Sequence, residues 1–287
     1  MGEGDTPLAE VRLRGRDVTV KLEFEAPTGS FKDRGAACLV AAALDVGATR
    51  LVADSSGNAG ISIAAYAARA GLPCEVFVSD ALPAAKLARI DARVRMVKGA
   101  REDVAAAAVA RVAETGAFYA SHVWNPWFFE GTKRYVYELV DQLGGRLPAA
   151  LVLPVGNGTL VLGAWRAMQE LGVTAPILAV QAVKCGPIAR AFDAGRQNVE
   201  AVEDEGTVAA GIAIAAPVRG SEILAAVRAS GGSVVTVTDE EILAAADELA
   251  TQGFLVEPTA AAPAAALEQL DIHDVVIPLA VGRRASA

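Results

Sequence analysis

The sequence has few of the residues on which several kinds of protein depend. Three of its 287 residues are cysteine and two are histidine, and the cysteines, at positions 38, 74 and 185, are too scattered for a disulfide framework or a CxxC metal site. We therefore predict no metal site and no histidine-based catalytic triad. Basic side chains number 26 against 34 acidic ones, and the net charge of -8 disfavours a surface that neutralises phosphate backbones. We expect no nucleic-acid partner.

Long apolar segments are also missing. Every apolar run is interrupted well before the ~18 residues that a transmembrane helix needs, and residues 1–18 are charged and rich in glycine, unlike a signal peptide. We therefore expect a soluble, cytoplasmic protein that does not enter a membrane. A hydrophobic content of 53% over this length is enough for a large core, which excludes intrinsic disorder.

Apolar, strand-like runs alternate with alanine-rich, helix-like stretches. The expected strands are 18–22, 50–53, 74–78, 94–97, 118–120, 150–155, 177–181, 234–237 and 275–279. The expected helices are 33–46, 58–70, 84–91, 101–115, 129–143 and 159–171, with another opening in a capping box formed by Thr238 and Glu241. Residues 193–210 are polar and aperiodic, and we expect a surface loop there. Short apolar strands separated by helices are typical of a parallel sheet covered on both faces, so we predict a doubly wound α/β fold.

Four clusters rich in glycine, serine, threonine and asparagine precede expected helices: 27–35, 54–60, 156–160 and 257–261. In open α/β sheets, ligands bind at the carboxyl ends of the strands, where helix N-termini offer free N–H groups and a positive dipole. We therefore expect these four loops to share one cleft.

The loop Gly156–Leu160 directly follows an apolar strand and opens a helix, which favours an anion. Its two glycines let the backbone approach a phosphate, and Asn157 and Thr159 add an amide and a hydroxyl. Val161 stands where a dinucleotide fingerprint has its third glycine, and no GxxxxGK[ST] occurs. A dinucleotide or nucleoside triphosphate is therefore disfavoured, and an ordinary capped turn remains the alternative.

Lys32 and the loop Ser55–Asn58 are the other candidates for chemistry. Lys32 falls in the first turn of an expected helix, where the dipole lowers its pKa, and a lysine that readily loses its proton can form a Schiff base with an aldehyde cofactor. The loop offers N–H groups and hydroxyls for a carboxylate, and an amide for a cofactor oxygen. Taken alone, a surface lysine beside Asp33 and a helix cap are the simpler explanations.

Taken together, the ordered motifs resemble the pyridoxal-phosphate enzymes of fold type II, also called the tryptophan synthase β family, and most closely its threonine synthases. The matching segments are GEGDTPL at 2–8, PTGSFKDRG at 27–35, SSGNA at 55–59, NP with EGTK at 125–133, and PVGNG at 154–158. The resemblance covers most of the chain. It implies two doubly wound αβα domains with mostly parallel central sheets, the smaller at 35–128 and the larger, cofactor-binding one built from 1–34 and 129–287. It also implies a homodimer.

The resemblance also implies roles for individual residues. Lys32 would form the Schiff base with pyridoxal 5'-phosphate and later act as acid and base, and Asn58 would hydrogen-bond the cofactor's 3'-oxygen. The residues implied to hold the cofactor's phosphate are Gly156, Asn157, Gly158, Thr159 and Leu160. Those implied to contact the substrate are Ser55, Ser56, Gly57, Asn58, Ala59 and Asn125.

The chain departs from the family pattern in three segments. Ala280 stands where the family usually has a hydroxyl side chain for the pyridine nitrogen, which would then have no side-chain partner unless Arg283 or Ser286 replaces the hydroxyl. Phe128 stands where threonine synthases often carry arginine, and 213–217 lacks the polar residues of the matching family segment.

Several ring-bearing side chains lie close in the sequence to Phe128, the second of these departures. Trp124, Trp127 and Phe128 would wall an apolar pocket or belong to the core. His122, close to Asn125, would either reach the cleft or have a structural role.

The resemblance thus implies an enzyme of amino-acid biosynthesis that carries out elimination or replacement on a small α-amino acid, as a threonine synthase or a threonine-synthase-like lyase. A serine/threonine dehydratase is the first alternative, because 156–163 also fits its glycine-rich loop, and a cysteine-synthase-like β-replacement synthase is the second. From other classes, we keep a catalytically impaired pyridoxal-phosphate-binding paralogue and an α/β protein that binds another anion at 156–160.

Overall fold

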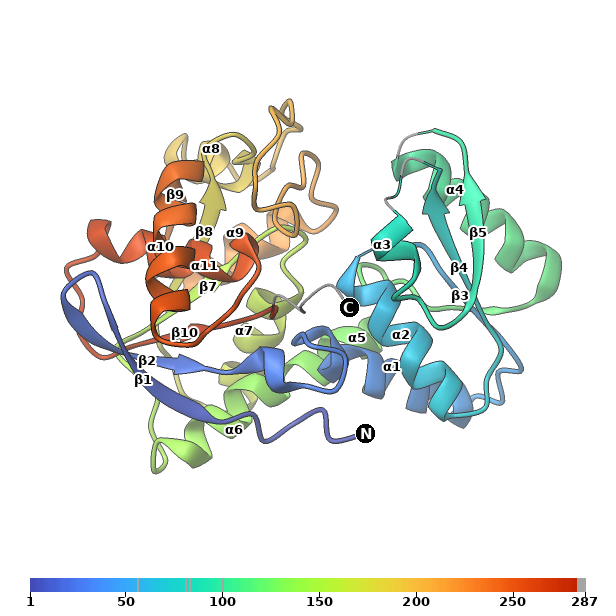
Figure 1. Ribbon diagram of the computed structural model, residues 1–287, viewed down its shortest axis with the longest axis horizontal. Helices are drawn as coiled ribbons and strands as arrows, with labels where there is room; N and C mark the ends of the chain where they lie inside the picture. Colours follow the sequence, from blue (N-terminus) through green and yellow to red (C-terminus); the bar gives the residue numbers. More distant parts are fainter. Residues whose placement is uncertain (56, 81, 83, 100, 283–287) are drawn as a thin grey trace. The chain divides into compact units, whose positions relative to one another are not determined.

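The computed structural model describes residues 1–55, 57–80, 82, 84–99 and 101–282 (Figure 1). Its contacts divide the chain into two compact units. Unit 1 consists of Met1–Glu3 and Ala26–Thr132, and unit 2 of Gly4–Glu25 and the chain from Lys133 onward. Residues 35–128 fall within unit 1, which also takes in 26–34 and 129–132. The domain division implied by the resemblance stays a prediction.

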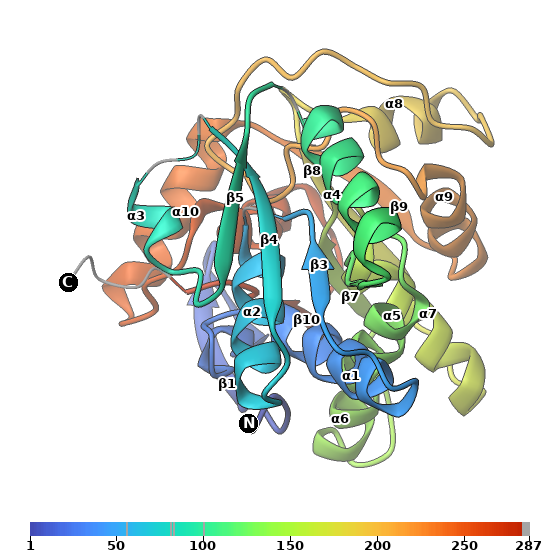
Figure 2. The ribbon, with the colours of Figure 1, turned by 90° about the vertical axis from the view of Figure 1, so that its right-hand side faces the viewer.

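Unit 1 is built on a parallel sheet of four strands in the order β5-β4-β3-β6 (Figure 2). These strands are β3 (Leu51–Ala53), β4 (Cys74–Ser79), β5 (Arg93–Val97) and β6 (Phe118–Tyr119). Its helices are α1 (Lys32–Asp45), α2 (Asn58–Arg69), α3 (Ala84–Leu87), α4 (Arg101–Thr115) and α5 (Pro126–Thr132).

Alternation along the strands explains why helices cover both faces of this sheet. Val76 and Val78 of β4 pack in the core cluster that contains the apolar side chains of α1 and α2. Phe77, between them, packs with Val104 and Ala108 of α4 in a second cluster. Because successive strand residues point to opposite faces, the two clusters lie on opposite sides of the sheet.

Unit 2 is built on a sheet of six strands in the order β1-β2-β10-β7-β8-β9. Its strands are β1 (Leu8–Leu13), β2 (Arg16–Lys21), β7 (Ala150–Pro154), β8 (Ile177–Ala182), β9 (Ser233–Val237) and β10 (Val275–Pro278). Only the pairing of β1 with β2 is antiparallel. The helices are α6 (Arg134–Gln142), α7 (Thr159–Leu171), α8 (Pro187–Asp193), α9 (Gly220–Ala229), α10 (Asp239–Thr251) and α11 (Pro258–Ala265), with short 3-10 turns at Glu23–Glu25 and Ala266–Gln269. The predicted α/β class with mostly parallel sheets is confirmed.

Several local predictions can be compared with these elements. The capping box at the start of α10 is confirmed, with Glu241 N donating to Thr238 Oγ1 at 3.2 Å and Thr238 N donating to Glu241 Oε2 at 2.7 Å. The helix expected over 129–143 is instead two helices, α5 and α6. Thr132 Oγ1 donates to the carbonyl oxygen of Phe129 at 3.0 Å, a bond that competes with the helical backbone pattern where α5 ends.

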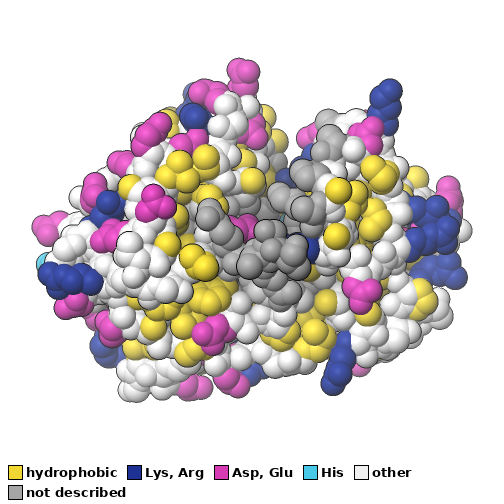
Figure 3. Space-filling view, viewed as in Figure 1, with side chains coloured by type: hydrophobic (Ala, Val, Ile, Leu, Met, Phe, Trp, Pro, Cys, Tyr) yellow, Lys and Arg dark blue, Asp and Glu magenta, His cyan; other side chains and the backbone are white. Residues whose placement is uncertain are grey.

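The surface of the molecule carries charges of both signs. On the face shown in Figure 3, acidic and basic side chains are interspersed with small groups of hydrophobic ones. Among the helices of the described residues, none is both long and apolar enough to cross a membrane.

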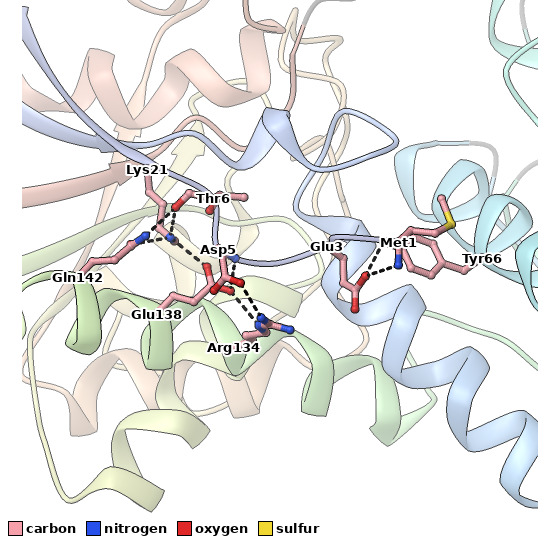
Figure 4. Close-up of polar contacts among 9 residues, drawn as sticks. All are labelled: Met1, Glu3, Asp5, Thr6, Lys21, Tyr66, Arg134, Glu138 and Gln142. Atoms are coloured by element: carbon pink, nitrogen blue, oxygen red, sulfur yellow. Dashed lines mark hydrogen bonds and ion pairs between the residues drawn. The ribbon is translucent and has the colours of Figure 1, made fainter.

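A buried ion pair holds the N-terminal segment of unit 2 in place (Figure 4). Lys21 is 0% exposed, and its Nζ lies 3.1 Å from Glu138 Oε2 on α6. The same Nζ donates to the carbonyl oxygen of Thr6 and to Gln142 Oε1, each at 2.8 Å. Glu138 also accepts a bond from the backbone N–H of Asp5 at 2.8 Å. These bonds join the segment before β1 to β2 and to α6.

We expect Lys21→Met to destabilise the protein by about 3 kcal/mol, because it leaves the Glu138 carboxylate buried without its lysine. Urea denaturation followed by far-UV circular dichroism measures the loss. Arg12→Gln is the control, since the Arg12–Asp17 pair is exposed at both ends and should contribute less than about 1 kcal/mol. Equal losses in the two variants would contradict the importance of the buried pair.

Candidate active site

The loop before α1 is fixed by a buried carboxylate. Asp33 Oδ2 accepts from the backbone N–H of Thr28 at 2.7 Å, and Asp33 Oδ1 accepts from the Thr28 hydroxyl. The hydroxyls of Thr28 and Ser62 lie 2.9 Å apart, which ties the loop to the second turn of α2. Asp33 is therefore held inside unit 1, with a pKa raised by burial. Asp33 is therefore not an exposed partner for a surface lysine, which was the simpler explanation of this segment.

Lys32 is the first residue of α1. Its pKa is lowered, as predicted, but the causes are burial and a neighbouring charge. Its Nζ lies 3.9 Å from the centroid of the Phe31 ring. Burial and, to a smaller extent, the positive charge of Arg101 together lower the pKa of Lys32 to about 7. The sequence-based expectation attributed the shift to the helix dipole. An amine with this pKa is largely uncharged just above neutral pH and is therefore a nucleophile and a base.

Close packing of α5 against the start of α1 brings a second group toward Lys32. A Cβ added at Gly35 would lie 2.4 Å from Cε1 of Phe128, and one added at Gly131 would lie 2.0 Å from the carbonyl oxygen of Arg34. Only glycine fits at these two crossing points. The Phe128 ring is fully buried, so it belongs to the core and does not wall a pocket. Trp124 and Trp127 are exposed.

His122 is the group that this packing positions. Its ring meets the Phe128 ring edge-on, with centroids 5.9 Å apart. The residue is 6% exposed, and its Nδ1 has no hydrogen-bond partner within the described part of the chain. Burial and the charges of Lys32 and Arg101 hold the pKa of His122 well below 6.5, so the imidazole is neutral at pH 7. The sequence left the role of His122 open; its place directly after an expected strand was the available signal.

The loop after β3 starts α2 without a side-chain cap from the residues that the structure describes. Gly57 is the N-cap residue and is exposed, and Asn58 begins the helix half-buried. Ser55 and Ala59 are buried, while Ser56 lies outside the described residues. The expected capping by serine or asparagine is therefore not seen at Ser55 or Asn58. Free N–H groups at this helix start are suited to a carboxylate.

Asn125 follows β6 and uses its amide within the protein. Its Nδ2 donates to the carbonyl oxygen of Tyr119 at 3.2 Å, and its Oδ1 accepts from the backbone N–H of Trp127 at 3.1 Å. Tyr119 in turn donates from its hydroxyl to Asp54 Oδ2 at 2.8 Å, which joins the end of β6 to the loop after β3. The substrate contact implied for Asn125 stays a prediction.

In unit 2, the loop between β7 and α7 has the form of an anion-binding turn. A Cβ added at Gly156 would lie 2.8 Å from Cγ1 of Ile214, and one added at Gly158 would lie 2.4 Å from Cδ1 of Ile223. Gly158 is the N-cap residue of α7, with φ of 73°, and no side chain of the described residues caps the helix. Thr159 and Leu160 begin α7 and are buried. The positive end of a helix of 13 residues thus lies at this glycine turn, which suits a phosphate.

Residues 1–279 match the family of pyridoxal-phosphate dependent enzymes. The chain belongs to this family. The threonine synthase of Methanosarcina acetivorans is 36% identical over 93% of this chain and 70% of its own length, and that of Mycobacterium leprae is 35% identical over 92% and 75%. Among solved structures, a threonine deaminase from T.th. superposes with a TM-score of 0.86 at 30% identity, covering 98% of this chain and 94% of that one. Maize serine racemase, at 21% identity and a TM-score of 0.85 over 97% and 88%, shares the fold.

The chain is therefore a pyridoxal-phosphate-dependent enzyme, and its residues fit the cofactor's aldehyde and phosphate. An amine with a pKa of about 7, such as that of Lys32, suits the aldehyde. The helix start of α7 with its two glycines suits the phosphate. Ala280 follows β10, the parallel neighbour of β7, and is fully buried. Residues 275–282 carry no hydroxyl, and the alternatives Arg283 and Ser286 lie outside the described residues. That the four predicted loops share one cleft stays a prediction.

We expect Lys32 of the apoprotein to be labelled by an amine reagent with a half-maximal rate near pH 7, because deprotonation of the amine is half complete there. Competitive labelling read by peptide mass spectrometry measures this. Lys184 is the internal control, since its bond to Asp239 raises its pKa and keeps it protonated over the same range. Arg101→Gln should move the Lys32 midpoint upward. Equal pH profiles for Lys32 and Lys184 would refute the assignment.

We expect His122 to remain neutral between pH 8 and pH 6, because burial and two nearby cations disfavour its charged form. The protein has two histidines, so NMR of histidine-labelled protein resolves the two C2–H signals, and His122→Asn assigns them. Below about pH 6.5 the unfolded chain binds a proton here that the folded chain does not, so this group makes the protein less stable as the pH falls. A midpoint near 6.5 for the His122 signal would be inconsistent with this environment.

Proposed function

We propose that the protein catalyses elimination or replacement on a small α-amino acid as a threonine synthase or a threonine-synthase-like lyase. The observation that carries this proposal is the match to proteins named threonine synthase, at 33–36% identity over roughly nine-tenths of the chain, with the reactive-lysine segment 27–35 inside the matched family region. The low pKa of Lys32 supports it independently. We also propose that the enzyme is a cytoplasmic homodimer, on the basis of the resemblance.

Different residues of the chain have different roles in the proposed reaction. Lys32 Nζ would hold the cofactor's aldehyde as a nucleophile and would accept the proton from Cα of the substrate as a base. The N–H groups at the start of α2, with the hydroxyls of Ser55 and Ser56, bind the substrate's α-carboxylate, and Asn58 binds the 3'-oxygen of the cofactor. The residues that hold its phosphate are Gly156, Asn157, Gly158, Thr159 and Leu160. When bound, pyridoxal phosphate supplies the electron sink that stabilises negative charge at Cα.

A serine/threonine dehydratase is the second candidate. It is supported by the 30% identity to a solved threonine deaminase that aligns with almost the whole chain. Both reactions begin with removal of the Cα proton by Lys32, so this residue does not discriminate between them. The group that leaves the substrate discriminates between the two reactions. A dehydratase releases hydroxide as water from serine or threonine, whereas a threonine synthase releases a larger anion.

We expect the purified enzyme to show a visible absorption band of lysine-bound pyridoxal phosphate that Lys32→Ala abolishes, because the mutant has no amine for the aldehyde. O-phosphohomoserine, threonine and serine are then added in turn, and the amino acid that shifts the band and turns over identifies the branch. Keto-acid formation from threonine would favour the dehydratase. Cofactor binding without exchange of the Cα proton of any amino acid would leave only the impaired paralogue.

A further inference from the structure

Asp54, the first residue after β3, is held by one side-chain bond among the residues that the structure describes. Its Oδ2 accepts from the hydroxyl of Tyr119, on β6, at 2.8 Å. Its other carboxylate oxygen, Oδ1, is buried and has no hydrogen-bond partner within the same part of the chain. The direction of the Asp54 side chain therefore depends on the tyrosine.

Tyr119 is itself fixed from three sides. It pairs with Val52 in the parallel register of β3 and β6, and Asp54 lies two residues beyond Val52, so the three side chains point to the same face of the sheet. The Tyr119 ring packs against the core cluster that contains Val52 and Val104. Its carbonyl oxygen accepts from Asn125 Nδ2 at 3.2 Å, just before α5. The hydroxyl of Tyr119 is thus a firm anchor for Asp54.

The donor in this bond stays protonated. Burial and, to a smaller extent, the charge of Asp54 raise the pKa of Tyr119 well above its usual value. The hydroxyl therefore donates at every pH at which the folded protein is studied. A hydrogen bond to an ionised acceptor is stronger than one between neutral groups, and its loss leaves a partly buried carboxylate without a partner.

The position of Asp54 determines where α2 begins. The chain turns from β3 into the helix within four residues, and Asn58 starts α2 without a side-chain cap from the described residues. A Cβ added at Gly60 would overlap the carbonyl oxygen of Ser55, so the third residue of the helix lies directly against the residue after Asp54. A displacement of Asp54 would therefore be passed on to the first turn of α2.

We propose that Tyr119 is a positioning residue, which acts through Asp54 to hold the first turn of α2 where it binds the substrate's α-carboxylate. The proposal rests on the proposed function, because it takes the N–H groups of α2 as the carboxylate site. Tyr119 supplies no group to the substrate. Its bond affects how well the carboxylate is held and not the proton transfer by Lys32, which lies on α1. Loss of the bond should therefore raise KM and leave kcat unchanged.

The first test reads the helix directly, on the cofactor-loaded enzyme without an amino acid. Ile61 N donates to the carbonyl oxygen of Gly57 at 3.2 Å in the first turn of α2, and Ala70 N donates to that of Tyr66 at 3.0 Å at its end. Amide hydrogen exchange followed by NMR separates the two bonds. We expect Tyr119→Phe to speed exchange at Ile61 about tenfold, the loss of one charge-assisted hydrogen bond, and to leave exchange at Ala70 unchanged.

Three further variants separate this bond from a general loss of packing. Asp54→Asn keeps an oxygen that can accept from the tyrosine and should retain most of the protection at Ile61. Asp54→Ala should match Tyr119→Phe, and the double variant should exchange no faster than either, because both changes break the same bond. The matched control is Tyr137→Phe, which removes a tyrosine–carboxylate bond, to Glu170, from unit 2. It should leave exchange at Ile61 unchanged.

Turnover supplies the second test. With the amino acid that the absorption experiment identifies, Tyr119→Phe should raise KM about tenfold at unchanged kcat, and Asp54→Asn should restore KM most of the way. The proposal is overturned if exchange at Ile61 keeps its wild-type rate in Tyr119→Phe, if Asp54→Ala leaves it unchanged, or if kcat and not KM carries the loss.

Failure of the proposed function is a separate result. If the protein takes up no pyridoxal phosphate or turns over no amino acid, exchange at Ile61 is measured on the cofactor-free protein. The effect of Tyr119→Phe and its absence in Asp54→Asn then support or overturn the role of Tyr119 at the start of α2 independently.

Discussion

The chemistry proposed for this enzyme depends on one constraint, namely that the amine of Lys32 must lose its proton near neutral pH. An exposed lysine does not meet it, because water stabilises the ammonium form. Unit 1 meets it by burying the start of α1 and by placing the charge of Arg101 nearby. The rigid bonding of Asp33 to Thr28 serves the same end, since it keeps the neighbouring carboxylate turned into the protein and away from an ion pair that would hold the lysine protonated.

Small residues make this arrangement sterically possible. Gly35 and Gly131 let α5 approach α1 so closely that a methyl group on either would overlap its neighbour, and this approach carries His122 toward the lysine. In unit 2, Gly156 and Gly158 allow a similar close approach at the start of α7. Ile214, which precedes α9, lies against Gly156, and Ile223 in the first turn of α9 lies against Gly158. In both units a helix begins without a side-chain cap from the residues that the structure describes.

The sequence predicted the parts of the structure that follow from local pattern. The period of apolar residues indicated most strands and helices, and the ordered motifs indicated the family. The assignment of Lys32 as the reactive lysine stays a prediction. The antiparallel strand β1 was not predicted, because only Val11 and Leu13 of its side chains are buried and charged residues alternate with them. The burial of His122 and the lowering of its pKa also escaped prediction. The burial of side chains and the meeting of loops at one edge of a sheet depend on tertiary packing. The spacing of residues in the sequence does not reveal that α5 packs against α1 beside Lys32.

Electrostatics also bears on the reaction type. Hydroxide is a poor leaving group and needs a proton donor, whereas a phosphate ester leaves with its charge and needs that charge stabilised. Burial above all holds His122 neutral, so this side chain is not a ready acid at pH 7. The proton that hydroxide needs in order to leave would therefore have to come from another group.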